Sequence, residues 1–251
     1  GQFGPALAAA EEICENLTED VIDLKDKPFI RYTMEGYFSM KVHAWVRFGK
    51  WRRIVQAHMP ENPDLYCVST SMHHYAKGVA HAALKDFDQA EEQKTRFYES
   101  LKRITPDRRF FNNPALQTLG VGEKMLLGEL EYHRGNHESA FDHLREAVKR
   151  SDSLHYSEPW PWMHPPRHAL GALLMEQGQH EEAETIYRED LGLTNSVVRC
   201  AQHPNNVWAL HGLVECLTIR GERGEKEELA NFKTLLNSAI AKADVAVMSS
   251  C

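Results

Sequence analysis

The hydrophobic residues of this chain recur with the three- and four-residue spacing of amphipathic helices. The pattern is clearest over residues 138–150, where five apolar side chains fall on one side of a helix. These side chains are Ala140, Phe141, Leu144, Ala147 and Val148. No segment shows the strict alternation of apolar and polar residues that is typical of a half-buried strand. The pattern therefore predicts an all-α fold.

Glycine, proline and short polar clusters divide the periodic segments into pairs of helices joined by tight turns. The expected pairs cover residues 28–58, 65–104, 115–150, 165–191 and 206–247, with a connecting loop over 105–114 and the last helix starting near Glu225. A helix over residues 5–17 has no helix before it and is interpreted as an unpaired second helix. We expect all of these helices to form a single domain over residues 1–251.

Small residues recur at matching positions of these pairs. A glycine in the first helix is followed by an alanine twelve positions later in the second helix. The examples are Gly78 and Ala90, Gly128 and Ala140, and Gly171 and Ala183, with a looser match from Gly212 toward Ala230. Because a small side chain lets two helix backbones approach closely, the repeat predicts antiparallel helix pairs that stack on their neighbours.

These residues also carry a family resemblance: the chain resembles a tetratricopeptide repeat (TPR) array. The matching positions are Leu127, Gly128, Ala140 and Ala147, then Leu170, Gly171, Ala183 and Tyr187, then Trp208, Gly212 and Leu213. The glycines lie 50, 43 and 41 residues apart, whereas the family period is about 34. The resemblance implies an irregular, right-handed solenoid of helix pairs that serves as a scaffold and binds a protein or peptide partner in its concave groove.

The helix over residues 5–17 has an apolar stripe that needs a cover. One hypothesis is that the chain is the C-terminal part of a longer TPR array. The other is that a partner covers the helix, either in a larger assembly or as a second copy of this chain in a homo-oligomer.

Charge and cysteine content limit the possible classes of partner and compartment. A formal net charge of -7 with only short basic clusters argues against nucleic-acid binding, which depends on clustered Lys and Arg. Five cysteines without any Cys-x-x-Cys pair indicate neither a disulfide framework nor a zinc ribbon. No apolar stretch is long enough to cross a bilayer, and no secretory signal is present. We therefore expect a cytoplasmic protein without membrane contact.

In TPR-like arrays the concave surface is formed mainly by the first helices, and the resemblance places His, Glu and Tyr side chains there. The expected groove residues are Tyr75, Glu129, Tyr132, His133 and His168, with His43 on the same surface. A segment rich in proline, residues 157–166, adds Trp160 and Trp162. The two tryptophans form a rigid aromatic lip, fill the space left by a long loop, or divide these roles with one exposed and one buried.

Three of the groove residues support a different class of function. Glu129 and His133 lie four positions apart on one helix, and His168 lies on the next first helix, so the three could hold a transition metal or act in acid–base catalysis. Alternatively, Glu129 and His133 form a simple intrahelical ion pair. No HExxH, Gly-rich phosphate loop or G-x-S-x-G motif is present. We therefore expect no cofactor and favour a binding scaffold over a metal-dependent enzyme or small-ligand binder.

Overall fold

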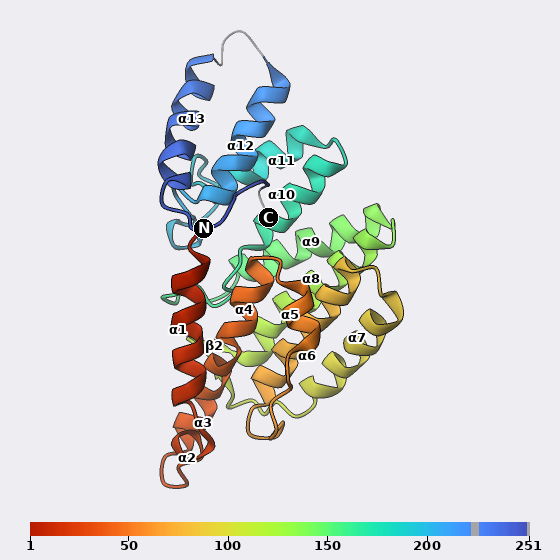
Figure 1. The fold of residues 1–251 in the computed structure, drawn as a ribbon, viewed down its shortest axis with the longest axis vertical. Helices are drawn as coiled ribbons and strands as arrows, with labels where there is room; N and C mark the ends of the chain where they lie inside the picture. Colours follow the sequence, from red (N-terminus) through yellow and green to blue (C-terminus); the bar gives the residue numbers. More distant parts are fainter. Residues whose placement is uncertain (222–225, 250–251) are drawn as a thin grey trace. The chain divides into compact units, whose positions relative to one another are not determined.

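The structure, a computed structural model, describes residues 1–221 and 226–249 and is built almost entirely from helices (Figure 1). This confirms the predicted all-α class. The chain forms two compact units: an N-terminal unit of Pro5–His164, and a C-terminal unit of Gly1–Gly4 with Pro165–Cys251. The single domain over residues 1–251 stays a prediction, because the contacts gather within these two units.

The N-terminal unit contains helix pairs that pack on their neighbours, with the most extensive contacts within α6–α7 and α8–α9 and between α6 and α8 (Figure 1). Its helices are α1 (Phe3–Asn16), α2 (Glu19–Ile22), α3 (Pro28–Met34), the 3-10 helix η1 (Glu35–Ser39), α4 (Met40–Arg47), α5 (Trp51–Gln56), α6 (Cys67–Ala83), α7 (Phe87–Leu101), α8 (Ala115–His133) and α9 (His137–Asp152). The expected pairs within residues 65–150 therefore appear close to their predicted bounds.

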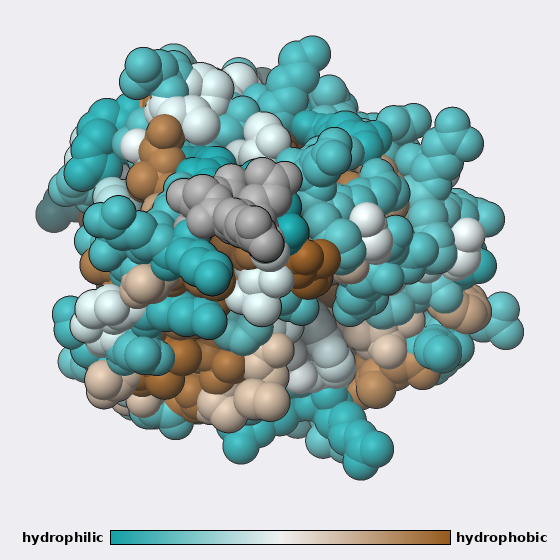
Figure 2. Space-filling view, turned by 90° about the horizontal axis from the view of Figure 1, so that it is seen from above, coloured by the Kyte–Doolittle hydropathy of each residue, from teal (hydrophilic) through white to brown (hydrophobic). Residues whose placement is uncertain are grey.

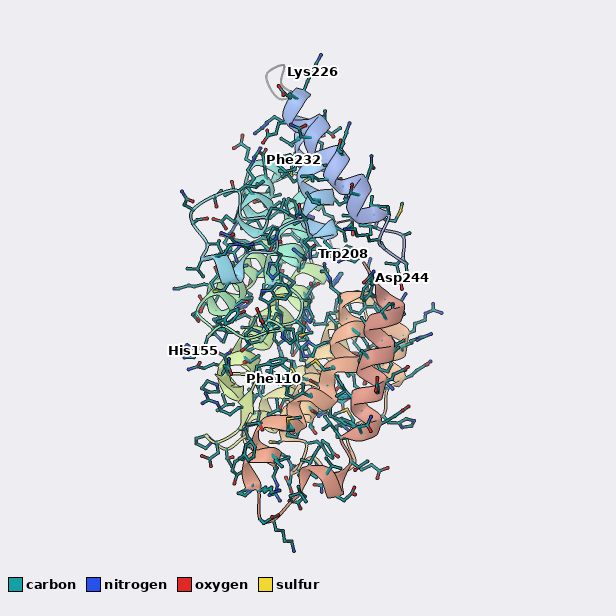
Figure 3. All side chains as sticks on the ribbon, turned by 90° about the vertical axis from the view of Figure 1, so that its left-hand side faces the viewer. Phe110, His155, Trp208, Lys226, Phe232 and Asp244 are labelled. Carbon is teal, nitrogen blue, oxygen red and sulfur yellow. The ribbon has the colours of Figure 1, made fainter. Side chains whose placement is uncertain are left out.

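Within the C-terminal unit, α10 packs on α11, α11 on α12, and α12 on α13. Its elements are α10 (Pro166–Glu176), α11 (His180–Asp190), the 3-10 helix η2 (Arg199–Ala201), α12 (Val207–Arg220) and α13 (Lys226–Ile240). Figure 3 labels Lys226 and Phe232 on α13. The predicted last helix ends earlier than Val247, and its expected start at Glu225 lies outside the described residues, as does Cys251.

The surface seen in Figure 2 is mostly hydrophilic, with separate hydrophobic patches. The exposed large apolar side chains of α12 and α13 are Ile219, Leu235 and Ile240. Because scattered apolar residues are normal on protein surfaces, these side chains do not by themselves mark a binding site.

Glycines lie where side chains of neighbouring helices come closest. In the N-terminal unit, a Cβ atom added at Gly128 would lie 2.6 Å from Leu144 Cγ across the α8–α9 pair. In the C-terminal unit, the ring of Tyr187 lies between Gly171 and Gly212, and a Cβ at Gly171 would lie 2.5 Å from its Cε1 atom. The small residues therefore permit the close helix packing that the repeat predicts.

The burial of its alanines shows how far the predicted glycine–alanine repeat extends. Ala90, Ala140 and Ala183 have no exposed surface. Ala230, the loosest match, is exposed on α13. The predicted extension of the glycine–alanine repeat to Ala230 in the last helix is therefore wrong.

The spacing predicts one helix over residues 28–48, but the structure divides it into α3, η1 and α4. The interruption contains Glu35, whose carboxylate accepts hydrogen bonds from Val68 N (2.8 Å) and Ser69 N (3.2 Å) and lies 3.3 Å from Arg108 Nη1. Burial raises the pKa of Glu35, and the two amides and the guanidinium oppose this rise. The helix is broken where a buried carboxylate turns toward the start of α6.

A small hairpin lies within residues 105–114, which the sequence predicts to be a loop. The strands β1 (Arg109–Phe110) and β2 (Asn113–Pro114) pair antiparallel, with Phe110 opposite Asn113. Two residues are too few for an alternating pattern to appear in the sequence, so the prediction that no strand occurs is wrong at this point.

The apolar stripe of α1 is covered by other residues of the N-terminal unit. Ile13 packs against a buried cluster that includes Leu17, Leu65 and Tyr66. Tyr66 Oη also donates a hydrogen bond to the carbonyl of Leu17 (2.9 Å). The stripe thus has a cover within the chain, and association of copies through this helix stays a prediction.

Candidate functional site

An aromatic pocket lies on the first helices of the N-terminal unit. It holds Trp162 of the connector, the name we use for residues 153–164 that follow α9. Trp162 is 2% exposed, and its ring lies edge-on to Tyr75 of α6 (5.2 Å between centroids) and to His43 of α4 (5.5 Å). The ring of His164 lies 5.0 Å from Trp162. In the cluster formed by these four residues, Trp162 meets each of the other three rings edge-on, a geometry that ring quadrupoles favour.

Helix α8 and the hairpin complete the seat of Trp162. A Cβ atom at Gly122 of α8 would lie 2.8 Å from Trp162 Cη2, so only glycine leaves room for the indole ring. Phe110 of β1 is fully buried and stacks on His43, with 6.0 Å between ring centroids. Figure 3 labels Phe110 and His155, which mark the hairpin and the start of the connector.

Two asparagines of the hairpin hold the backbone of the connector. Asn113 Nδ2 donates to His155 O (3.0 Å), and His155 N donates to Asn113 Oδ1 (2.7 Å). Asn112 Nδ2 donates to Tyr156 O (2.8 Å), and Asn112 N donates to Ser157 Oγ (3.2 Å). A side-chain amide offers the same donor and acceptor as a peptide group, so this clamp contacts the connector largely through its main chain.

The cluster contains buried polar atoms without partners. In the described part of the chain, the two ring nitrogens of His43 and the Nε1 atom of Trp162 have no hydrogen-bond partner. Burial, with a smaller contribution from His73, lowers the pKa of His43 to about 3. The pKa of His73 is itself lowered to about 4, chiefly by burial. Both imidazoles are therefore neutral at physiological pH.

The two tryptophans have different environments. Trp162 is buried in the cluster, whereas Trp160 is 43% exposed. Of the three arrangements considered from the sequence, the structure has the one with one buried and one exposed tryptophan. Trp160 is thus the more accessible ring of the pair.

The other predicted groove residues of this unit lie near the C-terminus of α8. Glu129 Oε2 and His133 Nε2 lie 3.6 Å apart. This is the intrahelical pair that the sequence offers as the alternative to a metal or catalytic site. Tyr132 is 7% exposed and stacks on His137, with 4.9 Å between ring centroids. Tyr132 therefore contributes mainly to packing between α8 and α9.

His168 lies in the C-terminal unit and is completely buried. Its Nε2 atom lies 2.8 Å from Asp190 Oδ2, and His203 Nδ1 lies 2.8 Å from Asp190 Oδ1. Burial by itself raises the pKa of Asp190, but the two imidazoles outweigh this effect and hold the pKa well below its usual range. This triad connects α10, the end of α11 and the loop that follows it.

The metal interpretation requires Glu129, His133 and His168 to act together. They belong to different units, and each is engaged inside its own unit. Among residues 1–221 and 226–249, no group of three or more His, Cys, Asp or Glu side chains is arranged to hold a metal ion.

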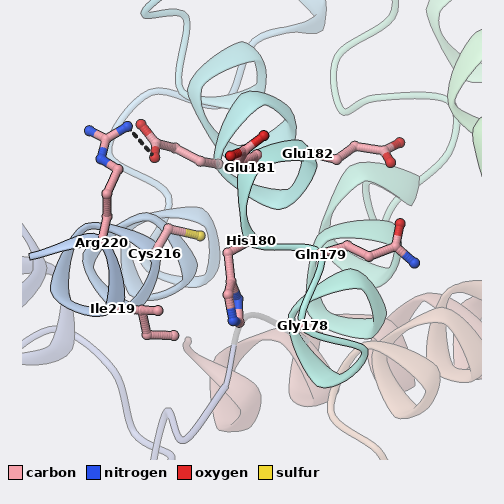
Figure 4. Close-up of a pocket in the computed structure, with 9 residues that line it drawn as sticks. Gly178, Gln179, His180, Glu181, Glu182, Cys216, Ile219 and Arg220 are labelled. Carbon is pink, nitrogen blue, oxygen red and sulfur yellow. Dashed lines mark ion pairs between the residues drawn. The ribbon is translucent and has the colours of Figure 1, made fainter.

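A separate pocket of about 550 Å³ lies in the C-terminal unit between the α10–α11 turn and α12 (Figure 4). Its lining residues are Gly178, Gln179, His180, Glu181, Glu182, Glu184, Cys216, Ile219 and Arg220. Arg220 Nη1 lies 2.8 Å from Glu184 Oε2, and His180 projects into the space beside Ile219. Burial is the main cause that raises the pKa of Cys216 to about 12, so its thiol stays protonated and is no nucleophile at neutral pH.

Several residues of the aromatic pocket give no recognisable signal in the sequence. Gly122 lies outside the repeated small-residue positions, and Asn112 and Asn113 lie in a segment predicted to be a loop. In the C-terminal unit, the acidic residues Glu181, Glu182, Glu184, Glu189 and Asp190 predict a solvated helix face. This prediction is wrong for Asp190, which is fully buried between His168 and His203. Only the tandem Asn–Asn before Pro114 offers a local hint of a tight turn.

The stacked helix pairs and close glycine contacts define the class of a helical repeat protein. Residues 167–205 match the family model described as tetratricopeptide repeat. The match over this segment and the helix pairs together support a TPR-type repeat protein, as the resemblance implies. No curated protein and no solved structure gives a match. Within the described residues, no helix combines the length and apolar character required to span a membrane.

Proposed function

We propose that this protein is a scaffold that binds a partner protein through a segment laid across the first helices of the N-terminal unit. TPR-type repeats are scaffolds usually involved in protein interactions, and the matched repeat supports this general role. The observation that carries the proposal is the connector: an irregular segment of this chain is already held on that face by a ring pocket and an amide clamp.

The predicted groove residues contribute unequally to the proposed interaction. Trp160, at 43% exposure, is the aromatic group best placed to contact a partner. The side chains of Glu129 and His133 are 14% and 25% exposed and offer hydrogen-bonding groups. Tyr75 and Trp162 act through the pocket that they form, because each is only 2% exposed. His168 is fully engaged by Asp190 and is left out of the proposed contact surface.

Site-specific photocross-linking tests this proposal. A benzophenone amino acid replaces Trp160 in one variant and Tyr98 in a control variant of the full chain. Tyr98 is a matched control because it is aromatic and similarly exposed, at 38% against 43% for Trp160, but lies on α7, the second helix of its pair.

We expect a discrete cross-linked partner in cell extract from position 160 and much less of the same partner from position 98. Equal cross-linking from both positions would show that binding does not use the first-helix face. An absence of any adduct from position 160, when position 98 captures a partner, would place the interaction on the other face of the helix pairs.

A further inference from the structure

The connector makes contacts with the N-terminal unit that resemble those of a bound peptide. One side chain, Trp162, fills a pocket made by residues from three helices, with Tyr75 and His43 at its sides and Gly122 beneath it. The preceding main chain is held by side-chain amides of the hairpin rather than by a helix or strand of its own. Pockets that take a side chain and amides that take the backbone are the two components of peptide recognition.

Some buried polar atoms where the connector contacts the N-terminal unit form no hydrogen bonds within the described residues. Buried indole N–H groups usually find an acceptor, but Trp162 Nε1 has none among the described residues. His43 adds a buried imidazole whose donor and acceptor are both unused. A seat that leaves three polar atoms unpaired holds its occupant less tightly than a satisfied core does.

We propose that the connector is an internal ligand, and that a partner binds the same pocket with its own tryptophan next to proline and displaces Trp162. This inference rests on the proposed function and names the chemistry of the partner segment. The connector itself identifies that chemistry, since Trp162 is preceded by Pro161 and followed closely by Pro165. Tethering gives the internal segment an effective concentration of about millimolar, so a free segment competes only when the internal one is weakened.

The probe for this idea is a fluorescein-labelled peptide with the sequence of residues 155–166. Its binding to the full-length chain is measured by fluorescence anisotropy. The test variant is Trp162→Ala, which empties the pocket. Trp208→Ala is the matched control, because it removes another buried tryptophan, 7% exposed, that belongs to the C-terminal unit.

We expect Trp162→Ala to bind the peptide about tenfold or more tightly than the wild-type chain or Trp208→Ala, because the tethered competitor is lost. The same peptide with alanine at the position of Trp162 should not bind. Adding a methyl group to the pocket with Gly122→Ala in the Trp162→Ala background should abolish binding, whereas Gly120→Ala should not.

Equal binding by all variants, or no binding by a Trp162→Ala chain with unchanged circular dichroism, would overturn the inference. If Trp162→Ala does not fold, Ser157→Ala takes its place, because it removes from the connector the hydroxyl that accepts from Asn112 N and leaves the pocket and the clamp unchanged. Unchanged peptide affinity would then overturn the inference. Loss of peptide binding with cross-linking at position 160 retained would reject the internal ligand alone. Loss of both would reject the proposed function as well.

Discussion

The substitution Gly122→Ala adds a single methyl group at the closest contact between α8 and Trp162. The new Cβ atom would lie 2.8 Å from Trp162 Cη2, 3.2 Å from Cζ3 and 3.7 Å from Tyr75 Cδ2. Carbon atoms at the first distance overlap strongly, since the optimal separation is about 3.5–4.0 Å. The indole cannot retreat freely, because the rings of His43, Tyr75 and His164 lie around it.

The expected loss of stability follows from two opposing effects. Overpacking a filled site costs about 1–3 kcal/mol, whereas alanine in place of glycine inside a helix gains about 0.5–1 kcal/mol. Gly120→Ala on the same helix provides the control, because its Cβ would contact the flexible side chain of Arg150, with Nη1 at 3.2 Å and Cδ at 4.0 Å. The helix-propensity gain is common to both variants, so Gly122→Ala should be less stable than Gly120→Ala by about 1–3 kcal/mol.

Urea unfolding followed by circular dichroism gives this difference in the free energy of unfolding. Acrylamide quenching of tryptophan fluorescence gives an independent readout, since Gly122→Ala should expose Trp162 and raise the quenching. A Gly122→Ala chain as stable as Gly120→Ala, with quenching equal to the wild type, would refute the seating of Trp162 on α8.

Two further substitutions test the buried ionisable groups. Asp190→Asn should lower the free energy of unfolding by about 3–5 kcal/mol at neutral pH, because it breaks the buried arrangement of Asp190 with His168 and His203. Asp142→Asn, at an exposed carboxylate, is the control. An equal effect of both substitutions would contradict the role of the triad. His43→Leu should reduce the loss of stability on acidification. With a folded pKa of about 3 and an unfolded pKa of about 6.5, His43 makes the unfolded state bind more protons between these values, so stability falls as pH is lowered through that window. Urea titrations from neutral pH to about pH 4 give the free energy of unfolding at each pH. Its decrease per pH unit should be smaller in His43→Leu by up to about 1.4 kcal/mol, while His73 contributes equally to both proteins. An identical pH dependence in the two proteins would contradict the assignment.

The aromatic pocket and the hairpin account for the path of the connector. Its start is fixed by Asn112 and Asn113, and its end by Trp162. A long loop without helix or strand is usually functional or disordered. Here side chains from the hairpin and three helices replace the hydrogen bonds and packing that a regular element would supply.

The helices and the glycine contacts between them could be predicted from local features of the sequence. The spacing of apolar residues follows the period of the α-helix, and the turns follow from glycine and proline, so both are local properties of the chain. The close approaches at Gly128 and Gly171 were predictable for the same reason, because a small residue at a helix contact is visible without knowledge of the rest of the fold.

The side chains that face one another across the fold could not be predicted in this way. Trp162 meets His43, Tyr75 and Gly122, which come from segments separated by up to 119 residues, and no local pattern specifies that meeting. His168 shows the same limit, because helical position placed it on the inner surface while the packing of α10 beside the end of α11 buried it on Asp190. Helix period is set by neighbours along the chain, whereas the partner of a buried side chain is set by the packing of whole helices.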